Sequence, residues 1–359
     1  MAHALRVGRR ALGLTGDNPP VGCLIVKSGQ VVGVGATAPG GRPHAETQAL
    51  AMAGEAARGA TAYVTLEPCC HHGRTPPCTD ALIAAGIARA VLAVQDPDPR
   101  VDGKGIAALL QAGVAVETGL MAEAAAHDLA GFFMRVRTGR PFVTLKLAVS
   151  SDGMIAAASG TRTAITGASS LARVHLLRAR SDSVLVGVST VLADDPLLTC
   201  RLPGMEDRSP DRVVTDSRLT MPTAARLIRS AASTPVRIYT LAGHDRAKAR
   251  PLAAMGAEIA VVAATPDNKV DLHALLATEA ERGCSRVLAE GGAHMAAALI
   301  DADLVDEVML FSAPQPIGPG GFPALADRPL TVVTESGAFR LLEREDLGDD
   351  TLTAYERVR

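Results

Sequence analysis

The sequence has no tryptophan, and aromatic residues make up only 3% of its 359 residues. With hydrophobic residues at 48%, a well-packed core must therefore consist mainly of Ala, Val, Leu and Ile. Acidic and basic residues nearly balance, and the formal net charge of −2 excludes the basic field that nucleic-acid binding requires. We find no secretory signal and no apolar run long enough to span a bilayer. We therefore expect a cytoplasmic protein with neither nucleic acid nor membrane as a partner.

The length of the chain predicts two domains. Short β-type runs alternate with helical stretches, and the alternation restarts after the Gly/Pro break Thr138-Gly139-Arg140-Pro141. We predict one α/β domain over residues 1–138 and a second over residues 142–359. In the first we expect strands at 21–26, 31–35, 62–66, 90–95 and 114–117, and helices at 44–57, 79–85, 105–111 and 121–137. In the second we expect strands at 142–149, 183–188, 213–215, 236–240, 258–262, 286–289, 305–311 and 351–357, and helices at 169–180, 245–255, 271–282 and 293–300.

Three of the six cysteines, Cys69, Cys70 and Cys78, fall within ten residues. In a reducing compartment such a cluster indicates thiols or metal ligands rather than disulfides. His44, Cys69 and Cys78 together offer one nitrogen and two thiolates, which leaves the fourth position of a zinc ion open for water, as in a catalytic site. Glu46 lies two residues after His44, so it diverges from the ligand position on a helix. Its carboxylate can then take a proton from that water and pass it to a leaving amine.

Two other interpretations of this cluster stay open. It could be a structural zinc site with a fourth ligand from Cys70, His71 or His72, but that leaves the His-x-Glu pattern at a helix start unexplained. Cys70 could also replace its neighbour Cys69 as a ligand. Because Cys78 opens a predicted helix, where free N–H groups favour negative charge, we expect its thiol to ionise readily.

The second half has no G-x-G-x-x-G pattern after its first strand, which argues against a standard Rossmann cofactor domain. Gly291 and Gly292 follow a predicted strand and open a helix, where backbone N–H groups can bind a cofactor pyrophosphate. Alone, this pair is more simply a turn. Lys146 lies in an apolar strand, where pairing with a neighbouring carboxylate would explain it. Asp194 begins the run Asp194-Asp195-Pro196, for which a helix-capping turn is a sufficient explanation.

The His-x-Glu and Pro-Cys…Cys patterns are typical of zinc nucleobase deaminases. Here eight residues separate the two cysteines, and residues 67–78, with the pattern E-P-C-x-H-x-G-x-T-P-P-C, resemble the deaminase domain of the bifunctional deaminase/reductase family of riboflavin biosynthesis. Residues 17–22 and 96–99 are similar to two further segments of that domain. Residues 145–153, 189–201 and 289–294 resemble, in the same order, the reductase domain of the family. The resemblance therefore covers nearly the whole chain, and its register favours Cys69 over Cys70.

This resemblance implies a cytidine-deaminase-like three-layer α/β/α domain followed by a dihydrofolate-reductase-like α/β domain, with Zn²⁺ and NADPH as cofactors. It implies hydrolysis of the 2-amino group of 2,5-diamino-6-(5-phosphoribosylamino)pyrimidin-4-one. The ribosyl group of the product, 5-amino-6-(5-phosphoribosylamino)uracil, would then be reduced to ribityl. The partner is thus a small pyrimidine ribotide. The family also implies a homo-oligomer formed through the reductase domain, for which the apolar strand at 305–311 is a candidate surface.

The resemblance assigns roles residue by residue. Glu46 would be catalytic in the deaminase, and Lys146, Asp194 and Glu290 would surround the hydride transfer. In the deaminase the substrate would contact Asn18, His71, Arg74 and Asp96, with Arg74 on the phosphate. In the reductase it would contact Arg162, Arg178, Leu198, Arg201 and Glu290, with Arg178 and Arg201 suited to clamp a phosphate. NADPH would contact Ala148, Ala164, Thr190, Asp194, Ser217, Gly292, Ala293, His294, Met295, Ala296, Ala297 and Ala298.

Three positions depart from the family pattern. Asp98 stands where Asn is common, which changes one polar contact in the deaminase. Arg162 and Ala164 stand where Ser and Trp are usual, and that Trp normally packs against the cofactor. Its loss motivates an alternative function, a deaminase with a catalytically impaired reductase-like domain.

Overall fold

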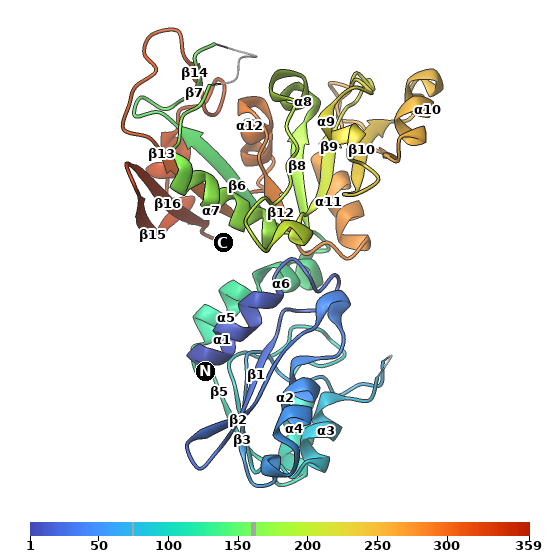
Figure 1. The fold of residues 1–359 in the computed structure, drawn as a ribbon, viewed down its shortest axis with the longest axis vertical. Helices are drawn as coiled ribbons and strands as arrows, with labels where there is room; N and C mark the ends of the chain where they lie inside the picture. Colours follow the sequence, from blue (N-terminus) through green and yellow to red (C-terminus); the bar gives the residue numbers. More distant parts are fainter. Residues whose placement is uncertain (74, 159–162) are drawn as a thin grey trace. The chain divides into compact units, whose positions relative to one another are not determined.

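The computed structural model describes residues 1–73, 75–158 and 163–359. The chain divides into two compact units, Met1–Arg140 and Pro141–Arg359, each with its own hydrophobic core (Figure 1). Among the described residues, no helix combines the length and the apolar character needed to cross a membrane.

The first unit contains a five-stranded sheet of order β2-β1-β3-β4-β5. Strand β1 runs antiparallel to both of its neighbours, whereas β3, β4 and β5 run parallel. The strands are β1 (Gly22–Lys27), β2 (Gln30–Ala36), β3 (Thr61–Val64), β4 (Arg89–Leu92) and β5 (Ala115–Thr118). The α-helices are α1 (Ala2–Gly8), α2 (Ala45–Ala53), α3 (Cys78–Ala84), α4 (Lys104–Gln111), α5 (Ala122–Asp128) and α6 (Ala130–Thr138), and the 3-10 turns are η1 (Arg9–Ala11), η2 (Pro39–Gly41) and η3 (Gly54–Ala57).

Helices cover both faces of this sheet, which is why the first four residues of β1 are all buried. Ile25 belongs to the core that includes Ala49 of α2, while Leu24, on the opposite face, packs with Ala4 and Val7 of α1. Alternate side chains of a strand point to opposite faces, so an unbroken apolar run is expected where both faces are covered. The unit is a three-layer α/β/α structure (Figure 1).

Two glycines of β2 let α2 lie unusually close to the sheet. A Cβ on Gly35 would lie 2.0 Å from the carbonyl oxygen of Ala45, and one on Gly33 would lie 2.1 Å from that of Ala49. Any other residue at either position would therefore push the helix away. This close packing fixes the N-terminal end of α2 against the sheet edge.

The second unit is built on a nine-stranded sheet of order β11-β10-β9-β8-β12-β6-β13-β16-β15. In this order, every strand from β11 at one end to β13 runs parallel to its neighbours. Strands β16 and β15 follow β13 and are antiparallel. These strands are β6 (Phe142–Val149), β8 (Ser183–Gly187), β9 (Asp211–Thr215), β10 (Val236–Leu241), β11 (Glu258–Val262), β12 (Arg286–Ala289), β13 (Glu307–Ser312), β15 (Phe339–Leu347) and β16 (Asp350–Arg357). Two short strands, β7 (Met154–Ala156) and β14 (Phe322–Pro323), form a separate pair. The helices are α7 (Ala168–Ala179), α8 (Val188–Asp194), α9 (Arg226–Arg229), α10 (Arg246–Ala254), α11 (Leu272–Glu281), α12 (Ala293–Asp301) and α13 (Thr331–Thr334). There is also one 3-10 turn, η4 (Glu206–Arg208), among the described residues of this unit.

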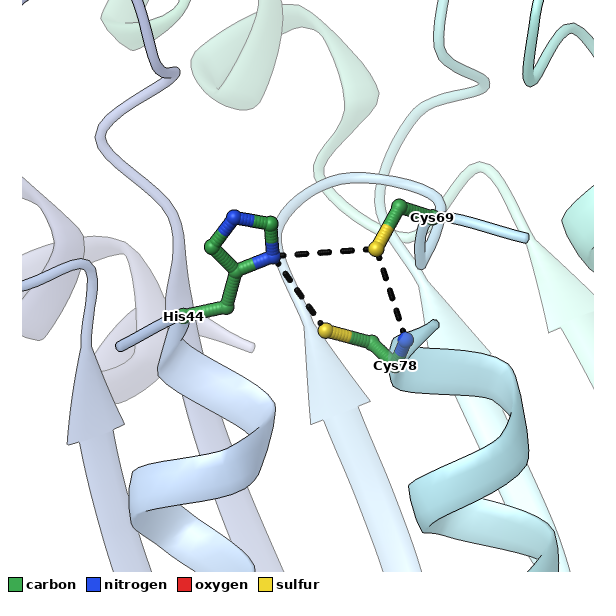
Figure 2. Close-up of side chains that lie close together, drawn as sticks. All are labelled: His44, Cys69 and Cys78. Carbon is green, nitrogen blue, oxygen red and sulfur yellow. Dashed lines mark hydrogen bonds between the residues drawn. The ribbon is translucent and has the colours of Figure 1, made fainter. Parts of the chain in front are cut away.

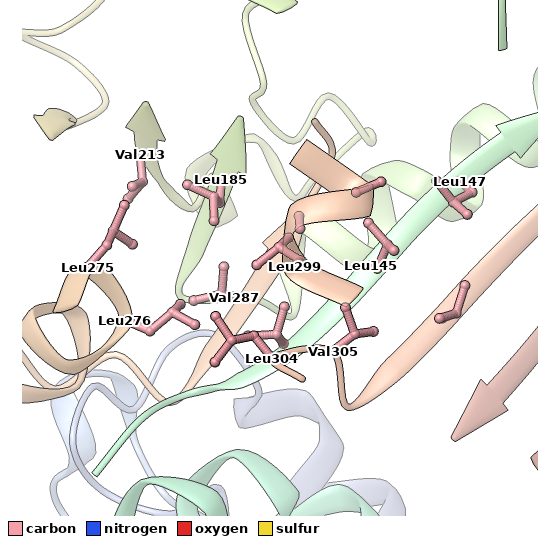
Figure 3. Close-up of a cluster of buried hydrophobic side chains, with 14 of the residues drawn as sticks. Leu145, Leu147, Leu185, Val213, Leu275, Leu276, Val287, Leu299, Leu304 and Val305 are labelled. Carbon is pink, nitrogen blue, oxygen red and sulfur yellow. The ribbon is translucent and has the colours of Figure 1, made fainter. Parts of the chain in front are cut away.

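Apolar side chains of adjacent parallel strands pack against α11 and α12 to form the core of this unit (Figure 3). In the register of the sheet, Ala289 of β12 stands opposite Leu145 of β6 on one side and Leu185 of β8 on the other. The carboxyl ends of these three strands therefore lie at one sheet edge. Lys146, Glu290 and the start of α8 meet there, at the kind of edge where parallel sheets bind ligands.

Most predicted elements are present, with ends shifted by a few residues. The helix predicted at 44–57 ends at Ala53 and continues as η3, and the helix predicted at 121–137 is divided into α5 and α6 at Leu129. The strand predicted at 305–311 is β13, which is paired with β6 on one side and β16 on the other. It therefore offers no free strand edge, and its suggested role as an oligomer surface stays a prediction.

Candidate active sites

His44, Cys69 and Cys78 come together in the first unit from three separate elements. His44 is the N-cap residue of α2, Cys69 lies in the loop after β3, and Cys78 is the first residue of α3. Nδ1 of His44 lies 3.3 Å from Sγ of Cys78 and 3.7 Å from Sγ of Cys69 (Figure 2). In the described part of the chain, these three residues form the one group of His, Cys, Asp or Glu side chains gathered closely enough to hold a metal.

The chemistry and spacing of these atoms fit zinc. All three ligand atoms lie within 4.8 Å of one another, and a tetrahedral ion bound at roughly 2.0–2.3 Å would need such spacing. Figure 2 shows Nδ1 of His44 directed at the two sulfurs while the other ring nitrogen points away. That nitrogen, Nε2, is buried and has no hydrogen-bond partner among the described residues, so it is free to carry the ring proton while Nδ1 binds the metal. Sγ of Cys70 instead lies 3.7 Å from the carbonyl oxygen of Arg100, outside this group.

The two thiols share a proton unequally. A hydrogen bond from the Cys78 thiol lowers the pKa of Cys69 to about 4. The same hydrogen bond, together with burial, raises the pKa of Cys78. In the metal-free site, burial and this hydrogen bond thus oppose the ionisation of Cys78 that its helix start was expected to favour. Each thiol must lose its proton when the metal binds.

Glu46 lies beside these ligands on the first turn of α2, and its side chain is buried. Burial, and secondarily the charge of Cys69, raise the pKa of Glu46 to about 7. Glu46 and two of the three candidate zinc ligands, His44 and Cys69, line a cavity of about 320 Å³. This volume suits a small organic ligand.

Three of the four predicted substrate contacts of the deaminase also line this cavity: Asn18, His71 and Asp96. Nδ1 of His71 is buried without a partner among the residues that the structure describes, which leaves it available to a ligand. Burial, together with nearby Asp98, raises the pKa of Asp96 to about 7. The fourth predicted contact, Arg74, lies outside the described residues.

Asp98, one of the departures from the family pattern, lines the same cavity and is paired with Arg100. The Asp98 carboxylate accepts hydrogen bonds from the backbone N–H of Arg100 at 2.9 Å and from Nη2 of its guanidinium at 2.6 Å. This pair holds the pKa of Asp98 below its usual range. The extra negative charge of the Asp98 carboxylate is thus neutralised within its own loop.

Glu67 is a residue whose role the sequence did not reveal. Its buried carboxylate accepts hydrogen bonds from the backbone N–H groups of Asp96 at 3.2 Å, Gly103 at 3.0 Å and Ile106 at 3.1 Å. It thereby joins the Cys69 loop to the Asp96 loop and to the start of α4. The sequence feature that could have revealed this role is the position of Glu67 two residues before Cys69. A buried carboxylate at that position needs hydrogen-bond donors, and the nearest ones are backbone N–H groups.

In the second unit the predicted polar groups meet at the sheet edge described above. Glu290 follows β12 and forms a two-pronged ion pair with Arg178 of α7, with contacts of 2.6 and 2.8 Å. Burial opposes ionisation of Glu290, but Arg178 holds its pKa below the usual range. Lys146 of β6 is half-buried; loss of hydration lowers its pKa, and it lies within the fields of Glu290, Arg178 and Asp194. Arg178 is therefore engaged by a carboxylate rather than free to clamp a phosphate alone.

The segment after α8 carries two more predicted substrate contacts. The side chain of Arg201 is exposed, and its guanidinium lies near the carbonyl and hydroxyl oxygens of Thr199. Leu198 has a φ of 56°, and its side chain is buried in the core beneath β8 and β9. Any contact of Leu198 with a substrate would therefore come from its backbone.

The predicted cofactor element is the start of α12. Its N-cap residue, Gly292, donates its backbone N–H to Oγ1 of Thr190 at 3.1 Å, and no side chain caps the helix. This open N-terminal end fits the pyrophosphate of a dinucleotide. Ala293 and Ala296 are buried against the core, so they can meet a cofactor only through backbone atoms. His294, Ala297 and Ala298 lie on less buried parts of the helix, as does Met295.

The other predicted cofactor contacts are more dispersed. Oγ of Ser217 accepts the backbone N–H of Val270 at 3.1 Å, which gives it a structural role already. Asp194 ends α8, and Ala148 lies near the end of β6. Ala164 is exposed, and Arg162 lies outside the described residues.

Comparison with known proteins places both units in one family. A family model described as the RibD C-terminal domain matches residues 141–353, and one for the cytidine and deoxycytidylate deaminase zinc-binding region matches residues 1–94. The riboflavin biosynthesis protein RibD of Escherichia coli K12 is 40% identical, over 98% of this chain and 96% of that protein. The chain belongs to the RibD family. RibD of Bacillus amyloliquefaciens is 41% identical over 89% of this chain and 84% of its own length.

Solved structures of RibD proteins agree along the whole chain. RibD of Acinetobacter baumannii superposes with a TM-score of 0.87 at 36% identity and covers 100% of this chain and 98% of its own. The deaminase/reductase of Thermotoga maritima superposes with a TM-score of 0.86 at 31% identity, covering 100% and 97%. The predicted fold class, a cytidine-deaminase-like unit followed by a dihydrofolate-reductase-like unit, is confirmed.

Membership of the RibD family also confirms the predicted class of activity. The chain is a bifunctional enzyme of riboflavin biosynthesis with a zinc-dependent deaminase and an NADPH-dependent reductase. Nothing in these comparisons favours the alternative of an impaired reductase.

Proposed function

We propose that residues 1–138 hydrolyse the 2-amino group of 2,5-diamino-6-(5-phosphoribosylamino)pyrimidin-4-one, and that residues 142–359 reduce the ribosyl group of the product to ribityl. The observation that carries the deaminase assignment is the group of His44, Cys69 and Cys78 beside Glu46 on one cavity. The Thermotoga maritima relative is a diaminohydroxyphosphoribosylaminopyrimidine deaminase and 5-amino-6-(5-phosphoribosylamino)uracil reductase, which supports the choice of substrates.

In the deaminase, Glu46 is the proposed proton carrier. Zinc, when held by His44, Cys69 and Cys78, would make the attacking water more acidic. Glu46 takes a proton from the water as its oxygen bonds to C2 of the pyrimidine. Glu46 then gives a proton to the amine nitrogen as the C2–N bond breaks and ammonia leaves. His71, Asn18 and Asp96 bind the ring, and Arg74 the phosphate.

In the reductase, the chain's residues bind and orient the sugar phosphate. NADPH, when bound along the start of α12, supplies the hydride for C1′ of the ribose. Lys146 and Glu290 surround the reacting carbon, and Arg201 binds the phosphate. Arg178 fixes Glu290 through the ion pair described above. The substrate contacts of Leu198 and Arg162, and the cofactor contacts of Ala148, Ala164, Asp194 and Ser217, belong to the same proposal.

The finer statements about location and assembly are also part of this proposal. A cytoplasmic location is supported by the six cysteines, which are all free thiols. A homo-oligomer through the reductase unit is supported by the edge strand β15, where the apolar side chain of Leu341 is 60% exposed.

The test is a coupled assay on zinc-loaded full-length protein with the diaminopyrimidine ribotide, following ammonia release and then NADPH oxidation. The Glu46→Gln variant should lose at least ~100-fold in ammonia release, because its amide cannot carry the proton. Its zinc content and its NADPH oxidation with the deaminated substrate should be unchanged. Ammonia release by Glu46→Gln at the wild-type rate would refute the assignment of the proton carrier.

A further inference from the structure

One side chain near the reductase site has no role in the proposed mechanism but contacts the segment that carries Arg201. His175 lies on α7, one helical turn before Arg178, and both reach the chain at Thr199. Nδ1 of His175 lies 3.1 Å from the carbonyl oxygen of Thr199 and 3.3 Å from the backbone nitrogen of Arg201.

A single ring nitrogen cannot serve both of these neighbours. If Nδ1 carries a proton, it donates to the Thr199 carbonyl and can no longer accept the N–H of Arg201. If Nδ1 is bare, it accepts that N–H. The Thr199 carbonyl is still satisfied in the second case, because Nη1 of Arg178 donates to it at 3.1 Å. Only the neutral imidazole with its proton on Nε2 therefore leaves both the Thr199 carbonyl and the N–H of Arg201 with a partner.

The charges around His175 favour the neutral form. Arg178 on the same helix and Arg201 on the facing segment both lie within its field, and Glu290 is the carboxylate that offsets them. That carboxylate is already paired with Arg178. Arg226 adds a further positive charge beside Arg201. Burial and these arginines lower the pKa of His175 below its ordinary value.

We propose that His175 is a positioning residue of the reductase, whose bare Nδ1 accepts the backbone N–H of Arg201 and so holds that guanidinium toward the substrate phosphate. The inference rests on the proposed contact between Arg201 and the phosphate. His175 acts through Arg201 and does not itself touch the substrate. Protonation of the ring would turn Nδ1 from acceptor to donor and release Arg201.

Three variants of the full-length protein test this inference in the NADPH oxidation assay with 5-amino-6-(5-phosphoribosylamino)uracil. His175→Leu removes the acceptor, whereas His175→Asn places an amide oxygen close to the position of Nδ1. Arg201→Met reports on the phosphate contact itself. We expect His175→Leu to raise KM for the ribotide roughly 3- to 10-fold, with kcat and KM for NADPH unchanged. His175→Asn should restore KM to within about twofold of the wild type.

The outcomes separate this inference from the proposed function. If Arg201→Met leaves KM unchanged, the phosphate contact itself is wrong. If Arg201→Met raises KM but His175→Leu does not, the role of His175 is wrong while the phosphate contact stands. Equal defects in His175→Leu and His175→Asn would also overturn the role of Nδ1 as an acceptor. Thermal unfolding of each variant shows whether the reductase unit is folded, and His175→Asn carries the test if His175→Leu is not.

The pH dependence of KM gives a second, independent readout. In the wild type, KM for the ribotide should rise as the pH falls through the pKa of His175, below about 6.5, because the acceptor is then lost. His175→Asn has no ionisable ring and should show only the change due to the substrate phosphate. If acidification instead tightens binding in the wild type relative to His175→Asn, the ring acts as a cation on the phosphate and the proposal fails.

Discussion

The two units reach their active sites by different routes. In the deaminase, the metal group comes from two short stretches, residues 44–46 and 67–78, whose residue types have few other uses in that pattern. In the reductase, the site is assembled from the ends of strands β6, β8 and β12 and from α7, which are far apart in sequence. Single residues there, such as Lys146 or Asp194, have an ordinary structural explanation. The deaminase site can therefore be recognised from the sequence. The reductase site can be recognised only when the register of the sheet is known.

Metal removal provides the largest test of this contrast. Chelation of zinc, or the substitution Cys78→Ser, should lower ammonia release by at least ~1000-fold, because a catalytic zinc site with three protein ligands has no spare ligand. NADPH oxidation with the deaminated substrate should continue unchanged. The matched control is Cys70→Ser, since this neighbouring thiol lies outside the metal group. A parallel loss of both activities after chelation would show that the two sites are not independent.

A smaller effect should follow from Glu67→Gln, which tests a residue that supports the Cys69 loop but is not in the metal group. An amide in place of the carboxylate leaves at least one of the backbone N–H groups of Asp96, Gly103 or Ile106 facing an NH₂ group, at a cost of about 1–3 kcal/mol. We expect a zinc affinity reduced roughly 10- to 100-fold, measured by competition with a chromophoric chelator. Glu55→Gln, an exposed carboxylate in η3, is the control and should leave zinc affinity unchanged.

The smallest effect concerns the reductase. Thr190→Val keeps the shape of the side chain but removes the oxygen that accepts the N–H of Gly292, so the start of α12 loses one hydrogen bond of about 1 kcal/mol. We expect KM for NADPH to rise about 2- to 5-fold, with the deaminase unaffected. Thr190→Ser keeps the oxygen and should behave as the wild type. A wild-type KM for NADPH in Thr190→Val would mean that this helix end does not position the cofactor.

The sequence was sufficient for the alternation of strands and helices and for the metal group, because apolar runs and Cys/His spacing are local signals. It was not sufficient for β15, whose residues are largely exposed and carry little apolar pattern. Nor could it show that the Arg178 guanidinium is paired with Glu290, that Leu198 turns into the core, or that His175 meets Arg201. Two of these features are contacts between segments more than twenty residues apart, and the third is a left-handed backbone at a leucine. Neither kind of feature produces a periodic pattern in the sequence.

The close packing of α2 against Gly33 and Gly35 limits how the metal site can be transferred to another protein. Because the helix backbone rests directly on the β1–β2 hairpin, the position of His44 and Glu46 is set by that hairpin and not by the helix sequence alone. A designer who grafts only residues 44–53 and 67–84 onto another scaffold should find the histidine misplaced. The smallest portable version of this zinc site includes both glycines and the strand that carries them.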